Sequence, residues 1–226
     1  MSDAGQREPA WRSRSDRLSA GLHGGAALLS AVGGAALLWS LPAESGGRTI
    51  LALAAYGVAL VLVFASSATY HAWPQWARRD IPATLDHCAI YILIAGTYTP
   101  FGLIALHGRG GALVVAIEWG LALLGVLART FWIRRLHRLS VPIYIAMGWL
   151  GLPWWRPLLE AIGPVGVALT VAGGVAYSAG TLFFRWHRLP YHNALWHLFV
   201  VAGAVLHFWA IAGYVLAPAA RAAGLP

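Results

Sequence analysis

Polar side chains with catalytic or metal-binding potential stand where two long apolar runs of the sequence meet. Ser67 and His71 are four residues apart at the end of one run, so a helix there would present both on one face. Asp86 and His87 open the next run, and the short polar stretch 73–83 would turn the chain so that the two ends meet. Ionisable groups in membrane-buried segments indicate function by default, because an aspartate at mid-depth in a bilayer costs about 2.5–3.5 kcal/mol.

A second polar cluster opens the last apolar run, YHNALWHLFVVAGAVLHFWA. Asn193 and His197 are four residues apart and share a helix face, whereas His192 is turned away from His197 by about 140°. His207 is ten residues further on, about 15 Å along a helix, and is too deep to share a ligand sphere with His197.

Imidazoles from two segments around one point, beside an aspartate and a serine, are the groups that a catalytic zinc site uses. Neutral histidines bind the ion, one position stays open for water, and neighbouring carboxylates orient the ligands. His71 and His197 are therefore candidate metal ligands. Asp86 would act as general base or hold the water, and Ser67 would donate a hydrogen bond to an oxyanion or hold a ligand.

Each of these residues also has a simpler interpretation. A histidine near a membrane boundary is often a hydrogen-bonded interfacial residue rather than a ligand. Ser67 would then be a small packing residue that bonds to its own helix, and Asp86 would cap the helix that follows it.

Three other features bear on the site. The start of the first apolar run adds Asp16, Ser19 and His23 at the same level as His71 and His197. The single cysteine, Cys88, excludes an internal disulfide and any thiolate-rich zinc or iron–sulfur site. Glu118 lies within an apolar run and has no clear partner.

The composition places these residues in a membrane protein. Of 226 residues, 59% are hydrophobic and 11% are charged, and the mean hydropathy is +0.64. The net charge of +8 comes from arginines in short loops, where they act as orientation signals. The expected partners are therefore membrane lipids and not nucleic acid.

The apolar runs predict an all-α bundle of seven transmembrane helices, each about the 20 residues that a bilayer requires. The domain is predicted over residues 18–217, between a polar cytoplasmic tail, 1–17, and a short outer tail, 218–226. A count of six is the alternative, because three prolines interrupt the fifth run. The predicted spans are 18–41, 49–72, 84–106, 112–133, 139–158, 163–185 and 191–217.

The arginines predict the orientation of the bundle. Twelve of the sixteen fall in the amino-terminal tail or in loops on its side of the membrane, and four fall on the other side. Because positive loops stay in the cytoplasm, the amino terminus is predicted inside and, with seven spans, the carboxyl terminus outside.

The motifs resemble those of the bacterial hemolysin III family, which belongs with the progestin and adiponectin receptors (the PAQR superfamily). The resemblance rests on SATYH at 67–71, LDH at 85–87 leading into AIYILIAGTYTPF, and WHLFV followed by HF at 207–208. It covers nearly the whole chain, including RRLHRLSVPIYIAMGW.

This resemblance implies a seven-helix bundle in the bacterial cell (inner) membrane, with a zinc ion near the cytoplasmic face. It implies His71 and His197 as ligands, Asp86 as the water-holding aspartate and Ser67 as the motif serine. The family's other ligand stands four residues before His197, where this chain has Asn193.

That departure leaves three interpretations open. His192 reaches the metal from an irregular helix start, His23 substitutes, or metal binds weakly or not at all. The family's amino-terminal motif of an acidic residue, an asparagine and a histidine is only partly kept, as Asp16, Ser19 and His23.

Two functions follow from the resemblance. The first is a zinc-dependent hydrolase acting on a lipid amide or ester, as in the receptor branch and the related alkaline ceramidases. The second is a non-catalytic regulator of membrane fluidity or lipid homeostasis, which needs no complete ligand set. A secreted pore-forming cytolysin fits less well, because seven full spans are ill suited to insertion into foreign membranes. A ligand-sensing receptor is a further possibility, but this chain has almost no extracellular domain with which to recognise a protein hormone.

Overall fold

The computed structural model describes residues 10–73, 80–131 and 139–216, and every regular element in these ranges is a helix. The all-α fold class is therefore confirmed. Because lipid offers no hydrogen bonds to the backbone, helices that satisfy their own N–H and C=O groups are the expected form of such apolar segments. The helices in chain order are α1 (Ala10–Trp39), α2 (Gly47–Ala72), α3 (Asp80–Pro100), η1 (Phe101–Ala105), α4 (Gly111–Phe131), α6 (Ser140–Gly148), η3 (Leu152–Trp154), α7 (Trp155–Arg185), α8 (His192–Ala210) and η4 (Ile211–Leu216).

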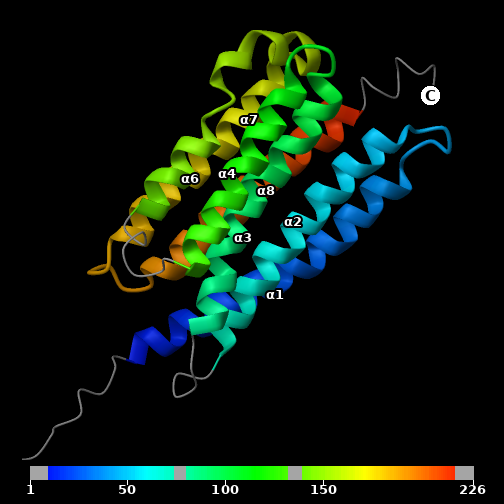
Figure 1. Cartoon of the computed structure of the whole chain (residues 1–226). Helices are drawn as coiled ribbons and strands as arrows, with labels where there is room; N and C mark the ends of the chain where they lie inside the picture. The colour runs from blue at the N-terminus through cyan, green and yellow to red at the C-terminus, as the bar shows by residue number, and fades with distance from the viewer. Residues whose placement is uncertain (1–9, 74–79, 132–138, 217–226) are drawn as a thin grey trace, which may run out of the picture.

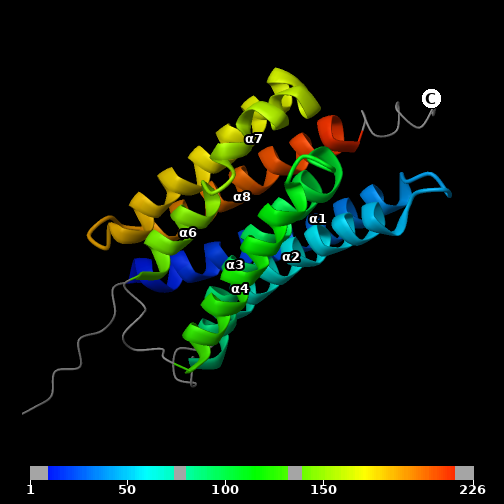
Figure 2. The same cartoon turned by 45° about the horizontal axis from the view of Figure 1, so that its top comes forward.

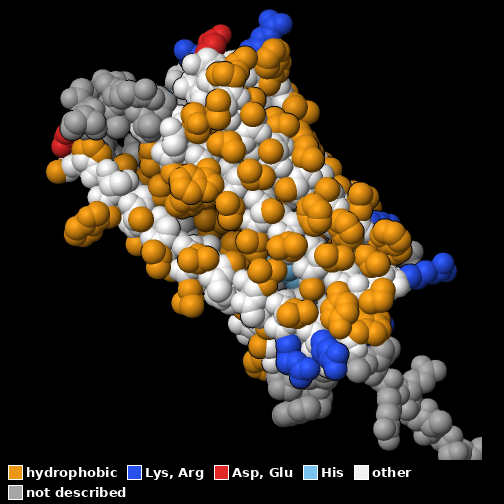
Figure 3. Space-filling view, turned by 180° about the vertical axis from the view of Figure 1, so that it is seen from behind, with side chains coloured by type: hydrophobic (Ala, Val, Ile, Leu, Met, Phe, Trp, Pro, Cys, Tyr) orange, Lys and Arg blue, Asp and Glu red, His pale blue; other side chains and the backbone are white. Residues whose placement is uncertain are grey.

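Apolar side chains cover the outside of the bundle. Leu28, Leu29 and Phe131 are each more than 70% exposed, as expected of side chains that face lipid. Figure 3 shows orange hydrophobic side chains over most of one face, with arginines gathered toward its two ends. Six helical segments of the described chain are long and apolar enough to span a membrane, so the prediction of a multi-pass membrane protein is confirmed.

The fifth of these segments, Ser140–Arg185, does not form one straight helix. Nine-residue α6 ends at Gly148, the turn η3 follows, and α7 is kinked where Gly163 adopts φ 69° immediately before Pro164. Figures 1 and 2 show α6 lying beside α7, so the chain doubles back within the segment. The prediction of a single helix over 139–158 is wrong, because the prolines and glycines of this segment interrupt it. The count of seven spans stays a prediction.

Two helices begin earlier than expected. α1 starts at Ala10, eight residues before the predicted span and inside the segment predicted to be a polar tail. α3 starts at Asp80, which places Asp86 in the second turn of the helix rather than at its cap. The capping interpretation of Asp86 is therefore wrong. Residues 1–9 of the predicted cytoplasmic tail and all of the predicted outer tail, 218–226, lie outside the described residues, as does residue 217 at the end of the predicted domain.

The main core lies where α1, α2, α3 and α8 meet, around fully buried Leu53, Tyr56 and Ile211. A smaller cluster joins α3, α4 and α6 around Tyr91 and Met147. α1 packs along α2, and α7 packs along α8 (Figure 1). These pairings bring the end of α2 and the start of α8 to the same end of the molecule.

Glycines let these helices approach closely, as expected of membrane bundles. A Cβ added at Gly34 of α1 would lie 3.3 Å from the Cα of Gly57 on α2. On α7, a Cβ at Gly173 would overlap the ring of His207, which occupies that space from α8.

Replacing Gly173 with alanine is expected to destabilise the protein by about 1–3 kcal/mol, since the methyl group would force the His207 ring out of its place. The neighbouring Gly174→Ala is the matched control. Its Cβ would lie 3.5 Å from the Trp149 ring, which is ordinary contact, and alanine favours the helix by about 1 kcal/mol. Thermal unfolding in detergent checks the pair, and a Gly173→Ala variant at least as stable as Gly174→Ala would contradict the packing described here.

Candidate functional site

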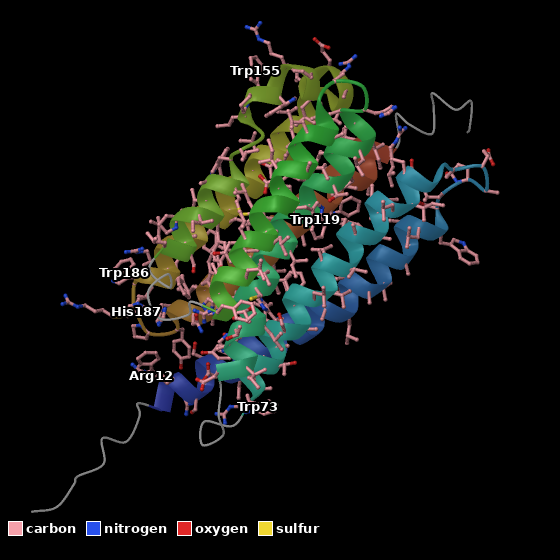
Figure 4. The ribbon with its side chains drawn as sticks, in the orientation of Figure 1. Arg12, Trp73, Trp119, Trp155, Trp186 and His187 are labelled. Carbon is pink, nitrogen blue, oxygen red and sulfur yellow. The ribbon has the colours of Figure 1, made fainter. Side chains whose placement is uncertain are left out.

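His71 and His197 meet at one end of the bundle. His71 lies in the last turn of α2 and His197 in the second turn of α8. Their Nε2 atoms are 2.8 Å apart, and both side chains are buried, with 6% and 4% of their surfaces exposed. Figure 4 shows Trp73, just beyond α2, and His187, just before α8, at this same end. The two histidines that the sequence predicts to converge are therefore brought into contact.

The carboxylate of Asp16, on α1, fixes the orientation of His71. Nδ1 of His71 lies 2.9 Å from Oδ1 of Asp16 and donates its proton to it. The neutral ring then carries a lone pair on Nε2, the atom that faces His197. A carboxylate on the far nitrogen of an imidazole is the usual support of a metal-binding histidine.

A third imidazole packs against this pair. His23, also on α1, has its ring centroid 4.1 Å from that of His197 and 5.0 Å from that of Phe64. Only 2% of its surface is exposed, and neither ring nitrogen has a hydrogen-bond partner among the described residues. The sequence predicted that His23 would lie at this level, and the structure places it in the site.

Asp86 and Ser67 stand beside the histidines. Ser67 is 1% exposed and lies one helical turn before His71. Asp86, on α3, is 13% exposed at its side chain and is close enough to Ser67 and His71 to interact with both. Its neighbour His87 donates from Nδ1 to the carbonyl oxygen of Ala83 at 2.7 Å. The two residues predicted to have catalytic roles therefore lie next to the histidine pair.

His192 is not brought to the pair. α8 begins irregularly, since Tyr191 before it has φ 59°, yet the His192 ring packs edge-on against His187 with centroids 5.2 Å apart. Asn193 lines the site's cavity in the described structure, whereas His192 does not. The position where the resemblance expects a histidine is therefore filled by an amide.

The site opens into an elongated, mostly apolar cavity of about 380 Å³. His71, Asp86 and His197 lie at one end, and Trp154 and Trp155 lie at the other. Figure 4 shows Trp155 at the end of the molecule away from Trp73 and Trp186. A cavity of this size and character suits a small apolar or lipid-like ligand.

Comparisons with known proteins identify the family. The family model described as "Haemolysin-III related" matches residues 12–208. The chain belongs to the haemolysin-III related family. It is 40% identical over 147 residues to "Hemolysin-3 homolog" of Bacillus subtilis (strain 168), covering 65% of this chain and 69% of the relative. It is 39% identical over 174 residues to "Hemolysin-3" of Bacillus cereus, covering 77% and 80%. No solved structure matches the chain.

The donor groups suit zinc, although they are not arranged as a finished metal site. Within the described ranges, no group of three or more His, Cys, Asp or Glu side chains is already placed to hold a metal ion. Two nitrogen ligands of tetrahedral zinc lie about 3.3 Å apart, so the 2.8 Å pair would need to part by about half an ångström. The unpartnered His23 nitrogens and the Asp16 support of His71 are features that a cation would complete.

The remaining residues singled out in the sequence have other surroundings. His207 donates from Nδ1 to the Gly203 carbonyl oxygen at 2.9 Å and stacks on Tyr177. Cys88 is buried as a free thiol. Glu118 is fully buried on α4, and its carboxylate oxygens have no hydrogen-bond partner in the described part of the chain.

Sequence reasoning missed Arg129, which it treated only as an orientation signal. Arg129 is 8% exposed at the end of α4 and interacts electrostatically with Asp86. Its Nε and Nη1 atoms have no hydrogen-bond partner in the ranges described. No local pattern identifies it, because its burial depends on which helices α4 packs against.

Proposed function

We propose that this haemolysin-III related protein is a zinc-dependent membrane hydrolase that cleaves an amide or ester bond of a lipid. The observation that carries the proposal is the contact of His71 with His197, with Asp16 behind His71 and Asp86 beside it. These groups stand at the end of an apolar cavity that can hold an acyl chain. The cavity therefore supports a lipid substrate, and the polar groups at its end support a hydrolytic reaction.

The proposed topology has seven spans, with the amino terminus in the cytoplasm and the carboxyl terminus outside. In Figure 1 the described chain starts and finishes at opposite ends of the bundle, as an odd number of passes requires. The number is seven when short α6 is counted as one pass. By the bias of positive residues, the site would face the cytoplasmic leaflet of the bacterial cell membrane. The described arginines at the end that holds the site are Arg12, Arg14, Arg17, Arg129, Arg185 and Arg188.

His71 and His197 would hold the ion through Nε2, with Asp16 keeping the His71 proton on Nδ1. When bound, zinc supplies a Lewis acid that polarises a carbonyl and lowers the pKa of water to about 7. Asp86 accepts the proton of the attacking water and passes it to the leaving amine or alcohol. The Ser67 hydroxyl donates to the oxygen on which negative charge develops.

The direct test is release of fatty acid from defined lipids. Purified protein in zinc-containing nanodiscs would be incubated with a ceramide and, separately, with a phosphatidylcholine, and free fatty acid measured by mass spectrometry. The proposal expects turnover of an amide or ester lipid that is lost in His71→Ala. Equal release of fatty acid by the wild type and His71→Ala would contradict the proposal.

Asn193 favours a second function. The amide at the position of an expected ligand fits a protein that binds lipid or a structural ion and regulates membrane fluidity without catalysis. Cells lacking the protein would then show altered bilayer order by an environment-sensitive dye, and expression of Asp86→Asn, which leaves the histidines in place, would restore it. Restoration by the wild type alone would favour catalysis.

Asp16→Asn is expected to weaken zinc binding about 10–100-fold, the usual effect of losing a carboxylate behind a metal-binding histidine. Asparagine keeps the size but no longer attracts the Nδ1 proton of His71 as strongly. A competition titration against a coloured chelator measures the change. The control is Asp80→Asn, at the exposed start of α3, and equal affinities for the two variants would contradict the role of Asp16.

A further inference from the structure

We infer that His23, on α1, supplies the third imidazole of the metal site in this chain, in place of Asn193 on α8. The inference rests on the proposed zinc site and names a ligand set particular to this sequence. It starts from α8, which has Asn193 where a third metal ligand is expected. An amide is not among the groups that hold zinc in proteins, and the ring of His192 lies against His187.

His23 is near enough to take that place. Its ring centroid is 4.1 Å from that of His197, and the His197 centroid is 4.7 Å from that of His71. Imidazoles that share a tetrahedral zinc have centroids about 5 Å apart. Both separations from the His197 ring are shorter than this distance, so modest side-chain rotations would turn one nitrogen of each ring toward a common point.

Burial gives an independent reason to expect a ligand at His23. Its ring is 2% exposed, and neither nitrogen makes a hydrogen bond of standard geometry in the described structure, although the backbone of His197 lies close to the ring. Leaving a buried polar atom unsatisfied costs about 1–3 kcal/mol, so such atoms normally have a partner. Phe64 covers the ring from the other side and offers none. A cation in the space shared with His71 and His197 would satisfy one of the two nitrogens.

The register of α1 points the same way. Asp16 and His23 are seven residues apart, two helical turns, and so lie on one face of α1. The hydrogen bond from His71 to Asp16 holds that face against α2. α1 therefore carries both the carboxylate that orients one ligand and the imidazole that completes the set.

A swap of ligands between helices tests the inference. Zinc stoichiometry and Kd would be measured for wild type, His23→Gln, Asn193→His and the double variant His23→Gln/Asn193→His. Glutamine keeps bulk and polarity, and size-exclusion profiles and melting temperatures show whether each variant is folded. We expect His23→Gln to weaken zinc binding more than about 100-fold, beyond the effect of losing a supporting carboxylate, and the double variant to recover it. The visible spectrum of bound cobalt, which reports coordination, should change in His23→Gln and return toward the four-coordinate form in the double variant.

The outcomes separate the inference from the proposed function. Wild-type affinity in folded His23→Gln, together with loss in His71→Ala, would overturn the role of His23 and leave the zinc site standing. Zinc binding by Asn193→His but not by the wild type would also overturn it. No binding by any variant, including Asn193→His, would remove the zinc site itself. If His23→Gln does not fold, the double variant Asn193→His/His23→Ala takes its place. A cobalt spectrum that is the same in this variant and in the wild type would support the swap. A wild-type spectrum typical of a site with fewer than three nitrogen ligands would overturn the inference.

Discussion

Replacing Asp86 with asparagine is expected to slow lipid hydrolysis by about 10²–10⁴-fold, the usual contribution of a general base, while zinc binding stays intact. Asp86 is 13% exposed at its side chain and lies beside His71 and Ser67 at the end of the cavity. Asparagine has nearly the same shape but cannot accept the proton of the attacking water. The measurement is the rate of fatty-acid release, taken with metal content on the same preparation.

Asp80→Asn is the matched control for this prediction, because Asp80 lies on the same helix but at its exposed first turn. It should retain the wild-type rate. A rate for Asp86→Asn within threefold of that for Asp80→Asn would remove Asp86 from the mechanism. Loss of zinc in Asp86→Asn would instead show that its carboxylate holds the ion.

His71→Ala and His197→Ala are each expected to abolish stoichiometric zinc binding and, with it, hydrolysis. Each removes one of the two Nε2 atoms that meet at 2.8 Å, and no other His, Cys, Asp or Glu stands three or four residues away on the same helix to replace it. Zinc would be measured by elemental analysis after dialysis against a weak chelator, and folding by the melting temperature.

His192→Ala is the control on the same helix, five residues from His197 and packed against His187. It should bind zinc as the wild type does. Loss of zinc in His192→Ala would instead support its assignment as a ligand from the sequence. Retention of zinc by both His71→Ala and His197→Ala would place any metal elsewhere in the protein.

The meeting of His71 and His197 could be predicted from the sequence, because it depends only on topology. Alternating spans put the end of α2 and the start of α8 at one end of the bundle, and helical periodicity puts His71 on the face of Ser67. Asp16 and His23 were expected at the same depth, but their contacts with His71 and His197 depend on the rotation of α1, which spacing along one chain does not determine.

The path of the predicted fifth span, in contrast, could not be predicted from the sequence. Apolar content predicted a helix over 139–158, but proline removes a backbone donor and glycine permits a sharp bend. The result is short α6, the turn η3, and a new helix, α7, that begins at Trp155 inside the predicted range. Composition predicts that such a segment is apolar, whereas its path depends on how α6 packs against α3, α4 and α7.

The surroundings of Arg129 and His192 could not be predicted from the sequence for a related reason. Each stands near a helix end, where a difference of one turn in packing decides between burial and exposure. Arg129 is buried beside Asp86, and His192 lies against His187. Charge and residue type predict what such a side chain can do, but only tertiary packing determines which group it meets.

The zinc content of the wild-type protein tests the account most directly. The protein would be purified in detergent without a metal-affinity step, supplied with zinc, dialysed and analysed for metal per chain. The account predicts about one zinc per chain, as three imidazoles and an open position would hold. No zinc above the buffer level would contradict it and leave the regulatory function as the better explanation of the polar cluster.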